Sequence, residues 1–308
     1  SADEAPRTTN QQIAVIGSGS MGRMISLQIA RHGFPVTLYD IEATALQNAK
    51  AAQQGYIKEW INGGLTSAWD GSDTLDRITY ATDLAEAVKD VDLVIEAIPE
   101  KIDLKRKIFH QLDALLRPHA VIATNSSSIR VSLLEDATER PEQVANFHFY
   151  MPVWDSPMVE VGGGTQTSPD VLDALSDFAR QIGILPLRVQ KESTGFIFNR
   201  VWRAIKKEVL KVADSGVASF EDIDRAWMLK FGTYDLPPFA QMDRIGLDVI
   251  QDIENHYASE SGNPDDLPPP ILTEKVARGD LGQKTGKGFY TYPNPTYADP
   301  DFLKPDSD

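Results

Sequence analysis

Short apolar runs alternate with amphipathic stretches over the first two thirds of the chain. The apolar runs have the length of buried strands, and the stretches between them repeat their apolar positions with the spacing of a helix. Strands and helices that alternate in this way form a parallel sheet covered by helices. The pattern therefore predicts an α/β domain with a doubly wound, mostly parallel sheet of the Rossmann type. The predicted strands are residues 13–16, 36–39, 91–98, 121–124, 145–149, 158–161 and 186–189, and the predicted helices include 21–31, 104–116 and 169–182.

The strand pattern ends near Gly195, and only helices are predicted beyond it. Ser219 and Asp222 have the spacing of a capping box, which marks the start of a helix. We therefore predict two domains, 13–193 for the α/β part and 194–308 for an all-helical second part. The clearest helices of the second part are 196–215 and 222–230, and proline-rich breaks occur at 237–238 and 268–270.

Residues 45–80 have helical rather than strand character. We expect them to form a helical excursion before the sheet resumes. Gly63 and Gly64, and further on Gly71, suggest a turn within this excursion.

A glycine-rich segment follows the first predicted strand. Residues 13–22 read Ile-Ala-Val-Ile-Gly-Ser-Gly-Ser-Met-Gly, which contains the pattern G-x-G-x-x-G between a strand and a helix. In this pattern the first glycine permits a tight turn, the second lets the backbone approach a pyrophosphate, and the third lets the helix pack on the strand. The free N–H groups of the helix then point at the phosphates. The predicted dinucleotide contacts here are Gly17, Gly19, Ser20, Met21 and Gly22.

The second predicted strand ends at an acidic residue, Asp40. It lies 18 residues after Gly22, where a carboxylate can accept hydrogen bonds from both adenosine ribose hydroxyls and would repel a 2′-phosphate. Ile41 and Glu42 follow, and neither offers a cation to a 2′-phosphate. The sequence therefore predicts NAD rather than NADP as the cofactor.

Composition excludes several classes of function. The 308 residues contain 42% hydrophobic residues and no cysteine, so disulfides, thiolate zinc sites and a cysteine nucleophile are ruled out; a cytoplasmic location is permitted, and we predict it. We predict no metal site. No apolar run approaches the ~20 residues needed to cross a bilayer. Residues 1–12 are polar and lack the apolar core of a signal peptide, and we interpret them as a loose leader.

The chain is strongly acidic, with 45 Asp and Glu against 30 Lys and Arg and a formal net charge of −15. Nucleic acids and anionic membranes bind positive surfaces, so neither is an expected partner. A coenzyme A ester, which is itself anionic, would need a local basic patch. An acidic surface can equally reflect solubility or a saline habitat.

Polar side chains lie after, or near the end of, three of the predicted strands, where doubly wound domains bind their ligands. Glu100 and, soon after it, Lys105 come after the third strand, and Asn125 to Ser128 come after the fourth. His148 lies within the fifth strand and is the best placed of the five histidines to meet a nicotinamide. Oxidation of an alcohol with NAD requires a base that takes the hydroxyl proton, and imidazole has a suitable pKa.

His148 has an alternative interpretation, because Phe147 and Phe149 flank it and a buried histidine that only fills the core is common. Glu160 favours the catalytic interpretation. It is the only ionisable residue of an apolar run, and a buried carboxylate needs a partner such as an imidazole N–H. The same alternation could place Glu160 on a solvated face, and spacing alone does not decide between the two.

Taken together, these motifs resemble the NAD-dependent L-3-hydroxyacyl-CoA dehydrogenases. The resemblance runs from about Ile13 to Tyr290. Besides the glycine segment, it rests on Val-Ile-Glu-Ala-Ile-Pro-Glu at 94–100, Thr-Asn-Ser-Ser-Ser at 124–128, His-Phe-Tyr-Met-Pro at 148–152 leading to Val-Glu-Val at 159–161, Gly-Phe-Ile-Phe-Asn-Arg at 195–200, and Gly-Gln-Lys-Thr-Gly-Lys-Gly-Phe-Tyr at 282–290.

The resemblance implies roles for the residues that match. It makes His148 the general base for the 3-hydroxyl, and Glu160 the group that orients His148 and steadies the imidazolium. It also implies a helical second domain, like that of 6-phosphogluconate dehydrogenase, which forms a homodimer and closes over the substrate. Ser127 and Asn199 would contact substrate and catalytic groups, and Glu100 and Lys105 would line the nicotinamide half of the cofactor site, with Asn125 beside them.

Two departures from the family concern the substrate. The family usually has Asn where this chain has Met151, and its coenzyme A arm is rich in cations, whereas residues 45–80 offer only Lys50, Lys58 and Arg77. Trp154 and Asp155 could in addition hold a cationic group, or they could be a core tryptophan and a turn residue.

Three functions follow from these observations. The first is an L-3-hydroxyacyl-CoA dehydrogenase. The second is a dehydrogenase of a free 3-hydroxy acid, similar to the carnitine or gulonate dehydrogenases. The excess of acidic residues and the small number of cations in residues 45–80 favour this second function. The third is a catalytically silent NAD-binding protein like the related lens crystallins, and the presence of His148, Glu160, Ser127 and Asn199 argues against it.

Overall fold

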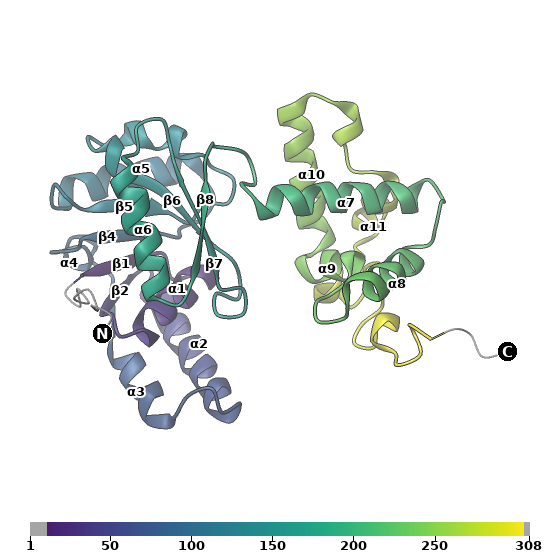
Figure 1. Ribbon diagram of the computed structural model, residues 1–308, viewed down its shortest axis with the longest axis horizontal. Coiled ribbons are helices and arrows are strands. Elements are labelled where there is room, and N and C mark those ends of the chain that lie inside the picture. The colour runs from purple at the N-terminus through teal and green to yellow at the C-terminus, as the bar shows by residue number, and fades with distance from the viewer. Residues whose placement is uncertain (1–10, 305–308) are drawn as a thin grey trace, which may run out of the picture. The chain divides into compact units, whose positions relative to one another are not determined.

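The computed structural model describes residues 11–304, without the side chains of Ala68 and Trp69. The predicted leader, residues 1–12, lies almost entirely outside this range. The chain divides into two compact units, the first ending at Ile197 and the second beginning at Phe198. Each unit has its own core and is described by itself (Figure 1).

The first unit is built on one eight-stranded sheet with the order β3-β2-β1-β4-β5-β6-β7-β8. All neighbouring strands are parallel except β6 and β7, which pair antiparallel. The predicted doubly wound, mostly parallel sheet is therefore confirmed. The strands are β1 Ile13–Ile16, β2 Val36–Tyr39, β3 Ile78–Ala81, β4 Leu93–Glu96, β5 Val121–Thr124, β6 Val144–Phe149, β7 Met158–Gly163 and β8 Leu185–Val189.

Helices cover both faces of the sheet, and successive residues of a central strand serve opposite faces. Ile13 and Val15 of β1 pack into one core cluster with residues of α1 and α6, while Ala14 and Ile16 pack into a second cluster with residues of α5. Burial on both faces explains why the central strands are continuous apolar runs. The helices of this unit are α1 Ser20–Arg31, α2 Ala43–Asn62, α3 Ala68–Asp76, α4 Leu84–Ala87, α5 Ile102–Leu115 and α6 Pro169–Gln181.

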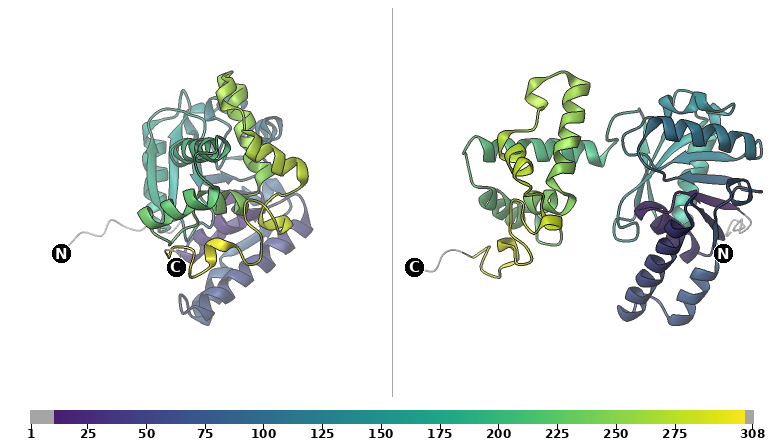
Figure 2. Two further views of the ribbon diagram at one scale, coloured as in Figure 1. Left: turned by 90° about the vertical axis from the view of Figure 1, so that its right-hand side faces the viewer. Right: turned by 180° about the vertical axis from the view of Figure 1, so that it is seen from behind.

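The predicted helical excursion is an arm formed by α2 and α3, which projects away from the sheet (Figures 1 and 2). The turn at Gly63 and Gly64 is confirmed, because α2 ends there. The expectation of a turn at Gly71 is wrong. Gly71 lies within α3, and a Cβ there would come within 2.6 Å of the Ile57 side chain, so this glycine lets the two helices pack closely.

The strand that sequence patterning missed is β3, the edge strand beside β2. It has four residues, of which only Ile78 is fully buried, so it carries little of the apolar signal of a central strand. The expectation that residues 45–80 are a helical excursion is therefore wrong for its last residues, 78–80, which belong to β3.

The described residues of the second unit form helices and turns around a separate core, which includes Leu210, Phe239 and Met242. The predicted start of one helix is confirmed, since the Ser219 hydroxyl accepts a hydrogen bond of 3.1 Å from the Asp222 N–H at the start of α8. The helices are α7 Phe198–Asp214, α8 Phe220–Phe231, α9 Pro238–Ile245, α10 Leu247–Ser261 and α11 Pro270–Arg278.

The segment 282–290, one of the motifs of the family resemblance, folds back onto a buried carboxylate of the second unit. Asp243 accepts hydrogen bonds from the N–H groups of Phe289 and Tyr290, both at 2.8 Å, and from the Tyr292 hydroxyl at 3.0 Å. A Cβ at Gly288 would overlap the Asp243 carboxylate. These contacts give the segment a role in folding the second unit. Among the described residues, no helix is long and apolar enough to cross a membrane.

Candidate functional site

The glycine loop between β1 and α1 has the geometry that a pyrophosphate requires. Gly17 has a φ of +100°, and a Cβ there would come within 2.6 Å of the Ala97 carbonyl oxygen. A Cβ at Gly22 would overlap the Gly17 carbonyl, whereas a Cβ at Gly19 would meet no atom within 4 Å. The backbone surface at Gly19 is therefore open to a ligand.

The start of α1 offers backbone donors to that ligand. The first hydrogen bond of the helix runs from the Arg23 N–H to the Gly19 carbonyl, and Gly19, the N-cap residue, has no side chain to cap the helix. The N–H groups of Ser20, Met21 and Gly22 precede this bond and have no partner within the helix. A phosphate fits such a site because N–H groups and the helix dipole both favour an anion.

Asp40 lies directly after β2 and is held by hydrogen bonds from within the protein. Its Oδ2 accepts from the N–H of Ser18 at 2.9 Å and from the Ser18 hydroxyl at 2.7 Å, and its Oδ1 accepts from the Glu42 N–H at 3.1 Å. Asp40 therefore lies beside the glycine loop, as an adenosine ribose site requires. Sequence reasoning did not identify Ser18, since it occupies a variable position of the glycine pattern.

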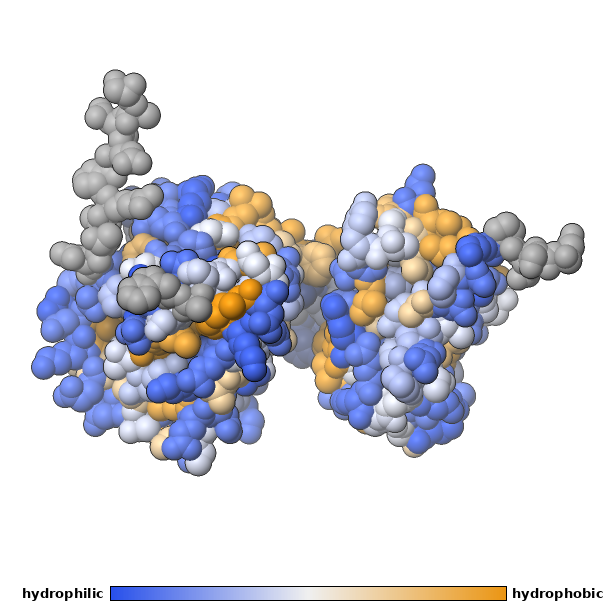
Figure 3. Space-filling view, turned by 90° about the horizontal axis from the view of Figure 1, so that it is seen from below, coloured by the Kyte–Doolittle hydropathy of each residue, from blue (hydrophilic) through white to orange (hydrophobic). Residues whose placement is uncertain are grey.

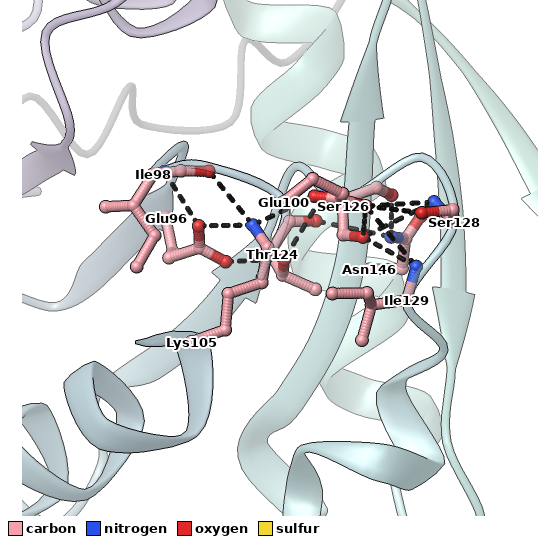
Figure 4. Close-up of polar contacts among 9 residues, drawn as sticks. All are labelled: Glu96, Ile98, Glu100, Lys105, Thr124, Ser126, Ser128, Ile129 and Asn146. Carbon is pink, nitrogen blue, oxygen red and sulfur yellow. Dashed lines mark hydrogen bonds and ion pairs between the residues drawn. The ribbon is translucent and has the colours of Figure 1, made fainter. Parts of the chain in front are cut away.

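Lys105 is fully buried, and its ammonium group has three acceptors within the protein. It lies 2.7 Å from Oε1 of Glu96, 3.2 Å from Oε2 of Glu100 and 3.2 Å from the Ile98 carbonyl oxygen (Figure 4). These acceptors match its three protons. Lys105 thus holds Glu100 in place. The predicted position of Lys105 beside the cofactor stays a prediction. Sequence reasoning missed Glu96, although a lone acid at the end of the apolar run 93–96 was a signal.

Glu100 is partly exposed at the sheet edge and is fixed by the loop after β5. Its carboxylate accepts hydrogen bonds from the hydroxyl of Ser126 and from the N–H and hydroxyl of Ser128, at 3.1 and 2.8 Å (Figure 4). Burial acts to raise the pKa of Glu100, but the Lys105 charge and the serine hydrogen bonds outweigh it and lower the pKa. Glu100 is therefore a fixed negative charge at this edge.

Two asparagines clamp the loop after β5 to the neighbouring strand β6. The side-chain oxygen of Asn125 accepts from the Phe149 N–H at 2.8 Å, and the amide nitrogen of Asn146 lies 2.9 Å from the Ser126 carbonyl oxygen. Ser127, the predicted substrate contact, is half-buried between these two attachments. Asn125 thus has a positioning contact to β6 in addition to its predicted place beside the cofactor.

His148 and Glu160 form a buried pair across two strands. They are directly opposite each other in the antiparallel register of β6 and β7, and Nδ1 of His148 lies 3.0 Å from Oε2 of Glu160. Glu160 is 0% exposed, so the alternative of a solvated face is wrong. Its other oxygen accepts from the Ile197 N–H at 2.9 Å. Because the carboxylate accepts at Nδ1, the neutral imidazole carries its proton there and presents a lone pair at Nε2.

Trp154 belongs to an aromatic cluster and not to an open binding surface. Its ring packs edge-to-face against Tyr56 at 4.9 Å and Trp60 at 4.8 Å, both on α2. Asp155 is exposed, in a turn closed by its N–H to the Pro152 carbonyl oxygen. The structure therefore supports the interpretation of Trp154 as a packing residue that attaches the β6–β7 connection to the arm.

Met151 and Asn199 complete the set of predicted site residues. The Met151 side chain is exposed near the end of β6, three residues after His148. Asn199 lies in the first turn of α7, in the second unit, so its predicted place near His148 stays a prediction. Among residues 11–304, no three His, Cys, Asp or Glu side chains gather closely enough to hold a metal ion.

A doubly wound sheet with this glycine loop and with Asp40 beside it defines an NAD-binding domain of the Rossmann type. Comparison with known proteins then gives the family. Residues 12–193 match the model of the 3-hydroxyacyl-CoA dehydrogenase NAD-binding domain, and residues 195–292 match that of the 3-hydroxyacyl-CoA dehydrogenase C-terminal domain. The chain belongs to the 3-hydroxyacyl-CoA dehydrogenase family and is an oxidoreductase with NAD as its cofactor.

Individual relatives cover almost the whole chain. The mitochondrial hydroxyacyl-coenzyme A dehydrogenase of Sus scrofa is 34% identical over 94% of this chain and 94% of its own length. The 5-formyl-3-hydroxy-2-methylpyridine 4-carboxylate 5-dehydrogenase of Mesorhizobium japonicum is 31% identical over 92% of this chain and 91% of its own length. Among solved structures, the (S)-3-hydroxybutyryl-CoA dehydrogenase of Ralstonia eutropha has a TM-score of 0.86 at 33% identity, covering 92% of this chain and 99% of that chain.

Proposed function

We propose that the protein interconverts the C3 hydroxyl of a 3-hydroxyacyl-CoA and the corresponding ketone, with His148 as the general base. The observation that carries this proposal is the buried pair of His148 and Glu160. The pair is held by two strands, β6 and β7. β6 is joined through parallel pairs to β5, β4 and β1, so the C-terminal ends of these strands lie on the same side of the sheet. The base and the cofactor loop therefore lie at the same C-terminal end of the strands.

The chain has residues for both parts of the reaction, the removal of the hydroxyl proton and the binding of the NAD that takes the hydride. Nε2 of His148 takes the proton from the substrate hydroxyl, and the carboxylate of Glu160 stabilises the imidazolium that forms. NAD, when bound, accepts the hydride from C3. The start of α1 would hold its pyrophosphate and Asp40 its adenosine ribose, and Glu100 would lie beside the nicotinamide half. Ser127 and Asn199 would contribute polar contacts to the substrate.

A free 3-hydroxy acid is the second candidate substrate, and the charges of the arm favour it. The Arg77 guanidinium lies 3.3 Å from the Ala30 carbonyl oxygen, and the Lys50 ammonium lies 5.5 Å from the centre of the Tyr80 ring. Lys50 and Lys58 are exposed and Arg77 is half-buried, so residues 45–80 offer no more than three cations to a phosphate. The arm also carries four carboxylates, which would repel the phosphates of coenzyme A: Glu59, Asp70, Asp73 and Asp76.

A substrate panel tests the proposal. The full chain should oxidise NADH with acetoacetyl-CoA, while acetoacetate and 3-dehydrocarnitine test the second candidate. Activity with acetoacetyl-CoA that far exceeds activity with the free acids supports the first proposal. Activity with the free acids alone would reject it in favour of the second. NADH binding with no turnover of any 3-keto compound would support a catalytically silent protein.

The homodimer implied by the family is also part of the proposal. Large apolar side chains are exposed on the second unit, as Figure 3 shows for one face, and such side chains are common at interfaces between subunits. Sedimentation of the full chain should give twice the monomer mass, and a monomer at micromolar concentration would contradict the proposal. The exposed side chains include Val201, Leu229, Phe231, Tyr234, Val249 and Ile253.

A cytoplasmic location is predicted as well, and cell fractionation tests it.

A further inference from the structure

Ser18 is buried in the glycine loop and donates both of its hydrogen-bond protons to one atom. It is 3% exposed, and its N–H and its hydroxyl both reach Oδ2 of Asp40, at 2.9 and 2.7 Å. Among the described residues, one more hydrogen bond reaches this carboxylate, from the Glu42 N–H to Oδ1. The carboxylate is thereby fixed in rotation as well as in position.

This arrangement determines how many acceptor positions Asp40 can offer to a ligand. A carboxylate has about four lone-pair sites. Ser18 occupies both sites of Oδ2 and Glu42 occupies one of Oδ1, so one site of Oδ1 is left for a ribose hydroxyl. The sequence alone suggested hydrogen bonds to both ribose hydroxyls, whereas the structure offers one fixed acceptor.

A fixed acceptor also affects the choice between NAD and NADP. A free aspartate side chain can rotate away from an incoming 2′-phosphate, which reduces the repulsion between the two anions. Ser18 prevents this rotation, because turning Asp40 away would break two partly buried hydrogen bonds to a charged group. We propose that Ser18 is a specificity-determining positioning residue, which holds Asp40 toward an unphosphorylated adenosine ribose. This inference rests on NAD as the cofactor and does not depend on the substrate.

The test is a binding measurement on the full chain without substrate. NADH and NADPH are titrated and followed by their fluorescence, for wild type and Ser18→Ala. Loss of a hydrogen bond to a charged group predicts about tenfold weaker NADH binding. NADPH binding should be unchanged or tighter, so that the preference for NADH falls about tenfold. Ser176→Ala is the control, since the buried Ser176 hydroxyl in α6 donates to the Leu172 carbonyl oxygen, outside the glycine loop.

A double-mutant cycle separates positioning from a general loosening of the loop. If Ser18 acts through Asp40, adding Ser18→Ala to Asp40→Ala should change the NADH dissociation constant by less than about twofold. Ser18→Gly, like Ser18→Ala, removes the hydroxyl and keeps the backbone N–H bond. It gives a second measurement if Ser18→Ala does not fold.

Three results would overturn the inference. They are unchanged or tighter NADH binding in the Ser18 variants, equal weakening of NADH and NADPH, and additive effects in the cycle. If the wild type binds NADH but reduces no 3-keto compound, the proposed function fails while the inference about Ser18 is still tested by these titrations.

Discussion

Glu160 lies directly across the β6–β7 ladder from His148, with its Oε2 3.0 Å from the imidazole Nδ1. Both residues are on strands of the central sheet and not on loops, and the second carboxylate oxygen of Glu160 is tied to the Ile197 N–H. Strands hold a catalytic geometry more accurately than loops do. The pair is therefore preorganised before any ligand binds.

The first prediction concerns Glu160 as the positioning residue of this pair. Glu160→Gln keeps the size of the side chain and removes its charge, so the imidazolium loses its stabilising partner. We expect kcat to fall at least about tenfold, with NADH affinity unchanged, because the base it supports contributes about 10²–10⁴-fold. Steady-state kinetics and NADH titration measure the two quantities. Glu86→Gln, at an exposed position, is the control. Full kcat in Glu160→Gln would show that the charge is not needed.

The second prediction concerns Asp40 and the cofactor. Asp40→Arg replaces a group that accepts a ribose hydrogen bond by one that attracts a 2′-phosphate. NADH should bind at least about tenfold more weakly, and NADPH should bind more tightly than to the wild type. Titrations of both cofactors check this, with Glu86→Arg as a control for the change of charge. An unchanged preference for NADH would remove the role assigned to Asp40.

The cofactor site was predictable because its residues lie close together in the sequence. Gly17 to Asp40 form a local unit, in which strand, turn, helix and second strand follow one another. The His148–Glu160 pair was less certain from sequence, since the register of two antiparallel strands depends on the connection between them. Here the connection is stabilised by Trp154, which packs on helix α2, about 100 residues earlier in the chain.

Ser18 and Glu96 were missed, and Ser126 was noted only as one of the polar residues 125–128; all three act through other side chains. Ser18 and Ser126 look like ordinary loop residues, and their contacts to Asp40 and Glu100 arise only when the sheet brings neighbouring strand ends together. Glu96 is hidden in an apolar run. The short edge strand β3 was missed for the opposite reason, as half-exposed residues give little apolar periodicity.

The third prediction concerns the buried ion pair of Lys105 and Glu96. Lys105→Met leaves the Glu96 carboxylate buried without its cation, and removal of one partner from such a pair costs about 3–5 kcal/mol. Chemical denaturation should show a loss of that order in the free energy of unfolding. Lys107→Met, on the exposed side of the same helix, should change it little. Adding Glu96→Gln to Lys105→Met should recover part of the loss, and no recovery would contradict this interpretation.

The fourth prediction is a pH dependence of stability in the second unit. Burial, with a smaller contribution from the Asp243 charge, raises the pKa of Asp224 from 3.8 to about 7, against hydrogen bonds from Phe239 and Tyr290. Between about pH 4 and pH 7 the folded state keeps a proton that the unfolded state loses, so the contribution of Asp224 to stability falls as pH rises. Stability should therefore decrease less from pH 5 to pH 8 in Asp224→Asn than in the wild type.

Unfolding free energies at the two pH values measure this difference. Asp222→Asn is the matched control, because Asp222 lies on the same helix with an exposed side chain. A pH dependence of Asp224→Asn identical to that of the wild type would mean that Asp224 does not titrate in this range.

The role of His148 as the general base of the oxidation, and hence as the proton donor of the reduction, is tested most directly by His148→Gln in a single-turnover reduction. The variant is mixed with NADH and the best 3-keto substrate of the panel, and the loss of NADH absorbance gives the rate of hydride transfer, while a separate titration gives NADH affinity. We predict a rate at least about 100-fold below that of the wild type, with the NADH dissociation constant within about twofold. A rate close to that of the wild type, with NADH binding intact, would contradict the assignment of His148 as the base.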